Sequence, residues 1–563
     1  ATYNTAIGGS AGAAITTGFD NTLIGGLAGD ALTDADYNTA IGKEALTSDT
    51  LGSRSTAVGW SALANQNFTS ATNSYNTAMG FQAGLAITTG TNNTLIGGLA
   101  GDALTVGEKN IALGYVALSS DTKGNKSTAL GYAALNAQNF TSATDTFNTA
   151  IGFEAGGAVT TGTNNTLIGG LAGDALTTGG GNVAVGYSSL TTATTGVNNT
   201  ALGISSLHLN TTGSLNTANG YQSLYANTTG GENVAIGDRA MATNTTGGNN
   251  TSIGSFALRF NTTASNNTAV GYSALTANTT GTRNTAVGMS AGAAITTGSY
   301  NVLMGAYTGD AITTGEQNVA VGDAALSANI TGTDNVSIGD QSLKVNTASN
   351  NTAVGSSALY ANTTGAQNTA VGKSALTANT TGATNTAVGE GALLINTTGS
   401  YHVALGRLAG QNITTGDGNV CLGYNALASS ATVNNEFTLG SSSITSLRCN
   451  DTTISSLSDS RDKTDVIDSP YGLGFINTVR PVQFKWESRD GNGKDGWTRV
   501  GFIAQELLVA CDGNNAVLDL VSEENPEKLE AKYGNLLPIA IQAIQELSAQ
   551  VDALTARITT LEG

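Results

Sequence analysis

The chain has 563 residues, 74 of them glycine, with 11% charged side chains and a formal net charge of -18 at pH 7. This acidic balance excludes a shaft that grips nucleic acid, because neutralising phosphates requires clustered lysine and arginine. No apolar run comes near the roughly 18 residues that mark a candidate membrane-spanning helix, so we expect no membrane insertion.

Charge and proline divide the chain into two parts of different composition. The first 450 residues carry 34 of the 62 charged side chains, and the last 113 carry the other 28 together with all four prolines. The three cysteines, Cys421, Cys449 and Cys511, show neither a disulfide pattern nor metal-ligand spacing, and the two histidines are isolated. We therefore expect a repetitive part and a separate C-terminal part, with no metal site or cofactor.

A repeat dominates the first part. Its unit reads Asn-Thr-Ala-Val-Gly followed by Tyr-Ser-Ala-Leu-Thr-Ala-Asn-Thr-Thr-Gly, as in residues 267–281. The motif glycine occurs 26 times from Gly8 to Gly440, and 22 of the 25 intervals are 17 residues long. Helical repeats have periods of about 33–47 residues and a 3.6-residue apolar periodicity, which this unit lacks. The sequence therefore predicts a mostly β fold in which residues 1–440 form a parallel β-solenoid, or β-roll, of 26 repeats.

The alternation within a unit predicts which side chains are buried. The residue before the motif glycine is almost always large and aliphatic, and we expect it to point inward, as for Ile7, Ile24, Ile41, Val58, Met79 and Ile96. A second apolar anchor follows the glycine by four or seven residues, as at Leu275, Leu359, Leu376, Ile15, Leu32, Leu104 and Ile312. A second glycine, as at Gly18, Gly90 and Gly281, predicts a bend that needs positive φ or a close backbone approach. The recurring asparagines predict amide ladders between coils.

One coil cannot be stable alone. Its two or three buried aliphatic side chains stabilise it by about 1.5–3 kcal/mol each, whereas ordering its backbone costs about 1–2 kcal/mol per residue. Stacking and lateral association must supply the difference, and thin coils lined by alanine and glycine favour a homotrimer. This part resembles the heads of trimeric autotransporter adhesins and the repetitive shafts of phage tail fibres. The resemblance implies a trimeric parallel β-roll, with the three chains either side by side or intertwined.

The last part has the pattern of a small α+β domain. Residues 441–457 form a transition segment, and residues 458–563 a separate domain. Within it we expect a turn and short helix at 469–477, a hairpin of strands at 482–486 and 499–503, and a helix from Ala504. A long helix after Pro538 carries apolar residues at spacings of three and four, namely Ile544, Leu547, Val551, Leu554, Ile558 and Leu561. This seam predicts a trimeric coiled coil, although it could instead pack against its own domain.

A serine and a lysine stand five residues apart where the repeat ends, in Ser458-Asp459-Ser460-Arg461-Asp462-Lys463. A hydroxyl becomes a nucleophile when a base takes its proton, and a neutral, desolvated lysine can be that base. The pattern indicates a self-cleavage site between Leu457 and Ser458. An uncleaved cap with an incidental Ser/Lys pair is the structural alternative.

The C-terminal residues resemble the intramolecular chaperone domain of phage endosialidases and tail fibres. The matching pieces, in the family's order, are residues 458–463, 480–486 with Phe484 and Trp486, 501–506, and the final coil with Glu546 and Leu547. The resemblance implies that the domain drives trimerisation of a fibre and then cuts itself off. It also implies that Ser458 is the nucleophile, Lys463 its general base, and Asp459 and Arg461 supporting residues of the motif.

This mechanism sets a requirement on the lysine. Lys463 must lose its proton near neutral pH, so burial has to depress its pKa, while the nearby acids Asp459, Asp462 and Asp465 act in the opposite direction. A pocket completed only in the trimer would tie cleavage to assembly.

The expected function is that of a phage tail-fibre or appendage protein that attaches to a host. Its only enzymatic activity would be a single cut by a Ser-Lys endopeptidase on its own chain, with no external substrate. Expected partners are two further copies of the chain, other virion tail proteins, and a host-surface glycan or protein receptor. The alternative is an extracellular adhesin or filament on a bacterial surface that carries the same chaperone.

Overall fold

The computed structural model describes residues 2–444, 446–448, 458–485, 497–523, 527 and 529–563. The chain falls into two compact units, Ala1–Asn351 and Thr352–Gly563.

The first unit consists of stacked coils. Each coil contributes one three-residue strand, and four coils each carry an additional two-residue strand, which together form two pairs. The strands are β1 (Thr5–Ile7), β2 (Thr22–Ile24), β3 (Thr39–Ile41), β4 (Gly52–Ser53), β5 (Thr56–Val58), β6 (Thr72–Asn73), β7 (Thr77–Met79), β8 (Thr94–Ile96), β9 (Ile111–Leu113), β10 (Gly124–Asn125), β11 (Thr128–Leu130), β12 (Thr144–Asp145), β13 (Thr149–Ile151), β14 (Thr166–Ile168), β15 (Val183–Val185), β16 (Thr200–Leu202), β17 (Thr217–Asn219), β18 (Val234–Ile236), β19 (Thr251–Ile253), β20 (Thr268–Val270), β21 (Thr285–Val287), β22 (Val302–Met304), β23 (Val319–Val321) and β24 (Val336–Ile338).

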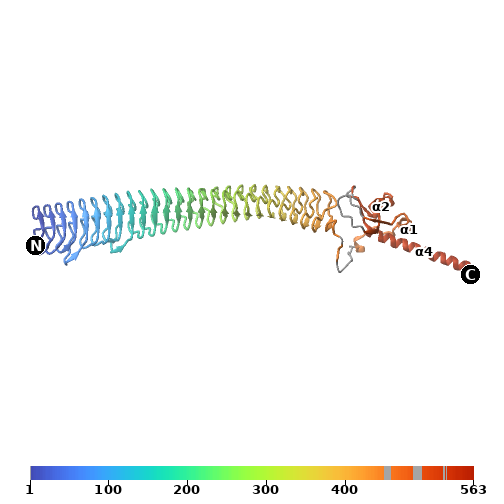
Figure 1. Ribbon diagram of the computed structural model, residues 1–563, viewed down its shortest axis with the longest axis horizontal. Helices are drawn as coiled ribbons and strands as arrows, with labels where there is room; N and C mark the ends of the chain where they lie inside the picture. Colours follow the sequence, from blue (N-terminus) through green and yellow to red (C-terminus); the bar gives the residue numbers. More distant parts are fainter. Residues whose placement is uncertain (1, 445, 449–457, 486–496, 524–526, 528) are drawn as a thin grey trace. The chain divides into compact units, whose positions relative to one another are not determined.

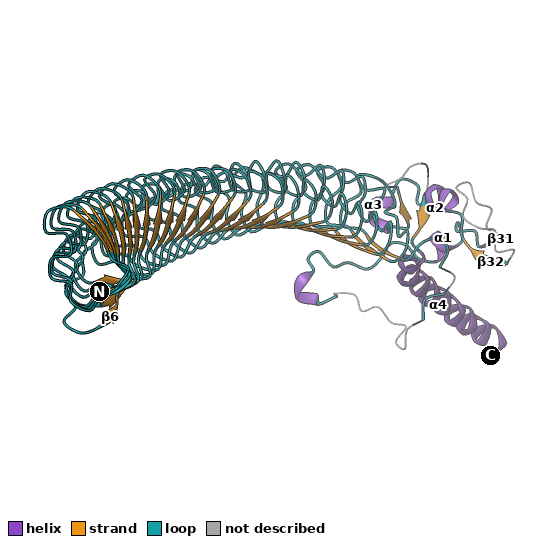
Figure 2. Cartoon of the chain, turned by 60° about the vertical axis from the view of Figure 1, so that its left-hand side comes forward, coloured by secondary structure: helices purple, strands orange, loops and turns teal. Residues whose placement is uncertain are grey.

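Successive coils pair in parallel and in register. Thr200 of β16 pairs with Thr217 of β17, and Leu202 with Asn219, an offset of one repeat. Figures 1 and 2 show the resulting rank of strands, each beside the strand of the next coil. The predicted mostly β, parallel solenoid is confirmed, with 26 such strands in the described part of the whole chain. Each of these ladders is formed within one chain.

The prediction that the residue before the motif glycine points inward is wrong. Ile7 is 59% exposed and Met79 46%, whereas the middle residue of the three-residue strands from β2 to β24, such as Leu23 and Ala40, is buried. Strand residues alternate between faces, so burial of the second residue sends the first and third outward. The reason for the small middle residue is that Leu275 and its equivalents four residues after the motif glycine already fill the interior.

The two kinds of apolar anchor fill the interior in complementary ways. Where glycine replaces the leucine four residues after the motif glycine, as at Gly292 and Gly309, leucine replaces alanine in a neighbouring strand. A Cβ on Gly292 would lie 2.8 Å from Cδ1 of Leu303, and one on Gly309 3.0 Å from Cδ2 of the same residue. The anchor then moves to the seventh position, where Ile295 and Ile312 are fully buried. Total side-chain volume is thereby conserved, as a closely packed core requires.

Two amide ladders hold the coils together, as the sequence predicts. In the first, the backbone N–H of Asn216 donates to Oδ1 of Asn199 (3.0 Å), and its own Nδ2 donates to the carbonyl of Gly230 (2.8 Å). In the second, Nδ2 of Asn244 donates to Oδ1 of Asn227 (2.7 Å). These side chains are fully buried, so each bond satisfies polar atoms that would otherwise be costly to bury.

The two longer intervals of the repeat build small side ladders. β4 pairs with β6, and β10 with β12, both in parallel. The aromatic rings of these insertions, Phe68 and Phe140, are buried, and the buried carboxylate of Asp49 accepts hydrogen bonds from the Phe68 N–H (3.1 Å) and from Nε2 of Gln66 (2.6 Å). The insertions are therefore structural bulges that carry their own polar core.

The second unit begins with solenoid coils and ends in short elements and a helix. The coils contribute β25 (Thr352–Val354), β26 (Thr369–Val371), β27 (Thr386–Val388), β28 (Val403–Leu405), β29 (Val420–Leu422) and β30 (Phe437–Leu439). The remaining elements are η1 (Ser460–Asp462), α1 (Leu473–Ile476), β31 (Val482–Lys485), β32 (Thr498–Gly501), α2 (Ala504–Ala510), α3 (Asn515–Leu518), β33 (Val521–Ser522), β34 (Glu530–Ala531), η2 (Tyr533–Asn535) and α4 (Leu536–Glu562).

The predicted elements of the C-terminal region are present. β31 and β32 form the expected antiparallel hairpin, with Val482 opposite Gly501. The long helix α4 begins at Leu536, two residues before Pro538, because proline is tolerated in the first turn of a helix, where its missing N–H is not needed. A small core forms around the start of α4 from Leu507, Cys511, Leu518, Leu520, Val521, Leu536 and Ile539.

Candidate active site

A short 3-10 turn shapes the segment that follows the transition. Its N-cap is Asp459, whose Oδ1 accepts a hydrogen bond from the backbone N–H of Arg461 (2.9 Å). The Arg461 guanidinium also pairs with this carboxylate, with Nη2 2.5 Å from Oδ2. The Arg461 guanidinium holds the pKa of Asp459 below its usual value. These two residues therefore stabilise the turn, which is the supporting position that the resemblance implies for them.

The turn brings the serine and the lysine together. Nζ of Lys463 donates a hydrogen bond to Oγ of Ser458 at 2.5 Å, across five residues of sequence. This is the distance at which a neutral amine could remove the hydroxyl proton. The carbonyl that the hydroxyl would attack belongs to Leu457, which lies outside the described residues.

The environment of this pair differs from the one that the mechanism requires. Every residue from Ser458 to Pro470 is exposed, including Lys463, Asp462 and Asp465. Burial that would favour a neutral lysine is therefore not provided by the single chain. Two aliphatic side chains just beyond the pair, Val466 and Ile467, are 77% and 82% exposed. The segment has the geometry of a Ser-Lys pair without the enclosure.

Other residues of the C-terminal motifs have structural roles that explain their identity. The Arg480 guanidinium pairs with the carboxylate of Glu506, with Nε 2.9 Å from Oε2. A Cβ on Gly501 would lie 2.7 Å from Oη of Tyr533, so a side chain there would displace the Tyr533 ring. Glu546 of α4 accepts a hydrogen bond from the Leu473 N–H at the start of α1 (2.8 Å), which holds the pKa of Glu546 below its usual value.

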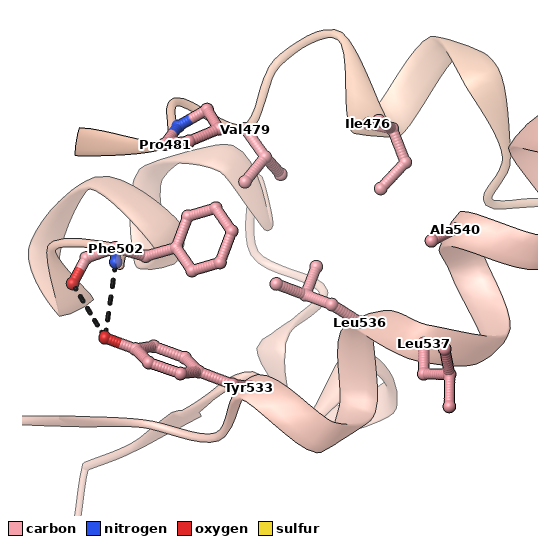
Figure 3. A pocket seen from close by; sticks show the side chains of 8 residues that line it. All are labelled: Ile476, Val479, Pro481, Phe502, Tyr533, Leu536, Leu537 and Ala540. Atoms are coloured by element: carbon pink, nitrogen blue, oxygen red, sulfur yellow. Dashed lines mark hydrogen bonds between the residues drawn. The ribbon is translucent and has the colours of Figure 1, made fainter. Parts of the chain in front are cut away.

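An apolar groove of about 330 Å³ lies beside this framework (Figure 3). It is lined by Ile476, Val479, Pro481, Phe502, Tyr533, Leu536, Leu537 and Ala540. The Tyr533 hydroxyl accepts from the Phe502 N–H (3.2 Å) and lies 3.3 Å from the Phe502 carbonyl, which fixes both rings at one end of the groove. Sequence reasoning did not find Tyr533 or the groove, because the lining comes from elements far apart in the chain and no local pattern marks them.

The apolar seam of α4 is exposed. Ile544 is 66% exposed, Val551 53% and Leu554 58%. The alternative that the whole seam packs against its own domain is therefore not supported, since only the first turns of α4, at Leu536, Ile539 and Ala543, are buried.

Within the described residues, histidine, cysteine and carboxylate side chains form no cluster of three that could hold a metal ion. In that same part of the chain, none of the helices combines the length and the apolar character needed to cross a membrane.

Comparison with known proteins bears on the C-terminal region. Residues 458–516 match the sequence profile of the family described as chaperone of endosialidase, and the match begins at Ser458. No curated protein and no solved structure matches the chain. The chain thus has an endosialidase-type chaperone region directly after a β-solenoid shaft, an arrangement that fits a tail-fibre-like protein. Such a region is typical of an extracellular or virion appendage.

Proposed function

We propose that this chain is a homotrimeric phage tail-fibre or appendage protein whose C-terminal domain drives trimerisation and is then released by autoproteolysis between Leu457 and Ser458. The observation that carries the proposal is the hydrogen bond between Lys463 and Ser458 at the first residue of the chaperone match. The shaft, residues 1–457, is the lasting product. Its proposed roles are attachment to a host-surface glycan or protein and assembly with other tail proteins.

The proposed cut uses only groups of the chain and water. Neutral Lys463 takes the proton of the Ser458 hydroxyl, and Oγ attacks the carbonyl carbon of Leu457. The tetrahedral species collapses as the Ser458 nitrogen leaves with the proton from Lys463, which converts the peptide bond into an ester. Water then hydrolyses the ester, restores the hydroxyl and leaves a carboxylate on Leu457 and a free amine on Ser458. The exposed state of Lys463 in the single chain agrees with a step that waits for assembly.

Substitution of the pair tests the proposal. Wild-type protein should yield two products, residues 1–457 and 458–563, whereas Ser458→Ala and Lys463→Ala should remain at 563 residues. Lys463→Arg should also fail, because arginine keeps the charge but cannot act as a base. Ser460→Ala is the matched control, since Ser460 lies in the same turn and should be dispensable. Gel electrophoresis and intact mass spectrometry measure the products.

The outcome also separates the proposal from its alternative. A wild-type trimer that stays whole would make the domain an uncleaved trimerisation cap. Cleavage at wild-type rate in Ser458→Ala would remove the assignment of the nucleophile.

A further inference from the structure

The outward-facing third residue of each solenoid strand forms a continuous line, which we call the outer row. In the described strands of the first unit, 19 of its 20 members are aliphatic or methionine. They are Ile7, Ile24, Ile41, Val58, Met79, Ile96, Leu113, Leu130, Ile151, Ile168, Val185, Leu202, Ile236, Ile253, Val270, Val287, Met304, Val321 and Ile338.

These side chains are accessible in the single chain. Ten of the nineteen are exposed, for example Met304 at 44%, Ile236 at 38% and Ile338 at 39%, and the other nine are half-buried. Two residues further along, just after the motif glycine, half of the coils of this unit add another large exposed side chain, namely Trp60, Phe81, Tyr115, Tyr132, Phe153, Tyr187, Ile204, Tyr221, Tyr272 and Met289.

The size of this surface calls for a covering partner. Coils lie about 4.8 Å apart, and side chains on one face lie about 6.5 Å apart along a strand. At that spacing, the outer row and the large side chains just after the motif glycine together cover roughly 900 Å² of apolar surface. Monomeric proteins seldom expose a contiguous apolar patch larger than about 600 Å². A stable protein interface takes about 800 Å² from each partner.

Three of the flanking rings are stacked on one another, which favours a protein partner over a sugar at this part of the row. Tyr132 and Phe153 stack on each other with centroids 5.3 Å apart and planes at 10°, and Tyr115 stacks on Tyr132 at 5.8 Å. Because the ring faces cover one another along the stack, the rings present their edges outward. A sugar that stacks on an aromatic residue needs an open ring face, whereas a packed side chain does not.

One member of the row breaks the pattern. Asn219 stands where every other coil of the unit has an aliphatic residue or methionine, and its side chain is exposed. No hydrogen bond of its amide occurs within the described part of the chain, in contrast to the buried ladder asparagines. The local fold of the coil therefore gives no reason for asparagine here.

We propose that the outer row is the surface through which copies of this chain contact one another, in axial register, so that the Asn219 amides of the copies meet at one level. This inference rests on the proposed homotrimer and adds its contact surface and register.

Register is a physical problem for this shaft because its coils are nearly identical. Copies shifted by one coil would still bury aliphatic against aliphatic at almost every level. Such a shift would place Asn219 opposite Leu202 or Ile236, where its amide finds no partner. In register, the amides can hydrogen-bond to one another, as a single buried asparagine does in coiled coils.

Engineered cysteines test the contact. Ile236→Cys lies in the row, and Thr246→Cys is an exposed position outside it. With a short bismaleimide, the Ile236→Cys protein should form same-residue cross-links at least about tenfold faster, because proximity raises the effective concentration of the second thiol. The native cysteines are present in both variants and in the unmodified control.

An isosteric charge tests the register. Asn219→Asp should bring like charges together at one level, and the trimer should melt at least about 3 °C lower at pH 7.5 than the Asn249→Asp control. The difference should close near pH 5 as the facing carboxylates take up protons. Asn249 is an exposed asparagine outside the row.

Equal cross-linking of both cysteine variants in a trimeric protein would overturn the proposed contact surface while leaving the proposed function intact. Equal melting of the two aspartate variants would overturn the register. A chain that sediments as a monomer before and after release would overturn the homotrimer itself, and with it this inference.

Discussion

At the scale of single residues, one substitution in the amide ladder makes the shaft sensitive to pH. His402 occupies a ladder position, and its Nδ1 accepts a hydrogen bond from the backbone N–H of Asn419 (3.1 Å). That bond needs the neutral ring with its proton on Nε2, which lies near the Gly416 carbonyl without a well-formed hydrogen bond. Burial holds the pKa of His402 below its usual value, against smaller opposing effects of the Gly416 carbonyl and the Asp417 carboxylate.

The sign of the pH effect follows from this lowered pKa. The unfolded state binds the proton more readily, so the contribution of His402 is fully present above its unfolded pKa of about 6.5 and is lost as the pH falls through the folded value. His402→Asn should remove this loss of stability between pH 8 and 5. It should also stabilise the coil by about 1 kcal/mol, because Nδ2 of the new asparagine can donate to a backbone carbonyl as Nδ2 of Asn385 donates to that of Gly399. Thermal unfolding against pH measures it. His208→Asn is the control, and an unchanged pH profile in His402→Asn would contradict the prediction.

At the scale of the coil, the motif glycine is required for stacking. Gly25 has φ +138°, and a Cβ there would lie 2.4 Å from the carbonyl oxygen of Gly42 in the next coil. The neighbouring Gly26 has nothing within 4 Å of the same position. Identical chemical changes at adjacent residues should therefore have very different effects.

Gly25→Ala should destabilise the coil by about 3–5 kcal/mol, from backbone strain and from separation of the coils. Gly26→Ala should change its stability by less than about 0.5 kcal/mol. Hydrogen exchange of the amides in residues 20–45 measures local opening, because each coil contacts only its neighbours. Similar protection in the two variants would show that the close approach is not a constraint.

At the scale of the whole molecule, we propose that the cut depends on assembly of the trimer. The serine and lysine are in place in one chain but exposed, and the seam of α4 is exposed as well. In the proposed trimer, association buries the seam and encloses the Ser458–Lys463 pair, so that the cut reports correct assembly.

A charge in the seam tests this link. Leu554→Asp should prevent trimerisation, because a coiled-coil core position does not tolerate a carboxylate, and should leave the chain uncut at 563 residues. Gln550→Asp, on an exposed position of the same helix outside the seam, should trimerise and cleave normally. Sedimentation velocity and gel electrophoresis provide the two readouts. A monomeric Leu554→Asp protein that cuts at wild-type rate would separate cleavage from assembly.

The solenoid, its period and its amide ladders could all be predicted from the amino-acid sequence. Each coil meets only the next, so contacts between residues 17 apart repeat along the chain and are visible as a period. The hairpin, α2 and α4 were equally predictable, since their patterns are local. The Ser458–Lys463 pair could be named from spacing at a change of composition.

The tertiary structure alone decided which face of the strand is buried. Alternation predicts two faces of a strand but not which face points inward. Here the larger strand residues face outward, because Leu275 and its equivalents already fill the interior of the coil. The groove at Tyr533 and the exposure of Lys463 were likewise decided by packing between distant segments, which no local pattern encodes. Contacts that repeat at a fixed spacing are visible in the sequence. Packing between side chains that are distant in the sequence is not, because it depends on how the folded chain brings them together.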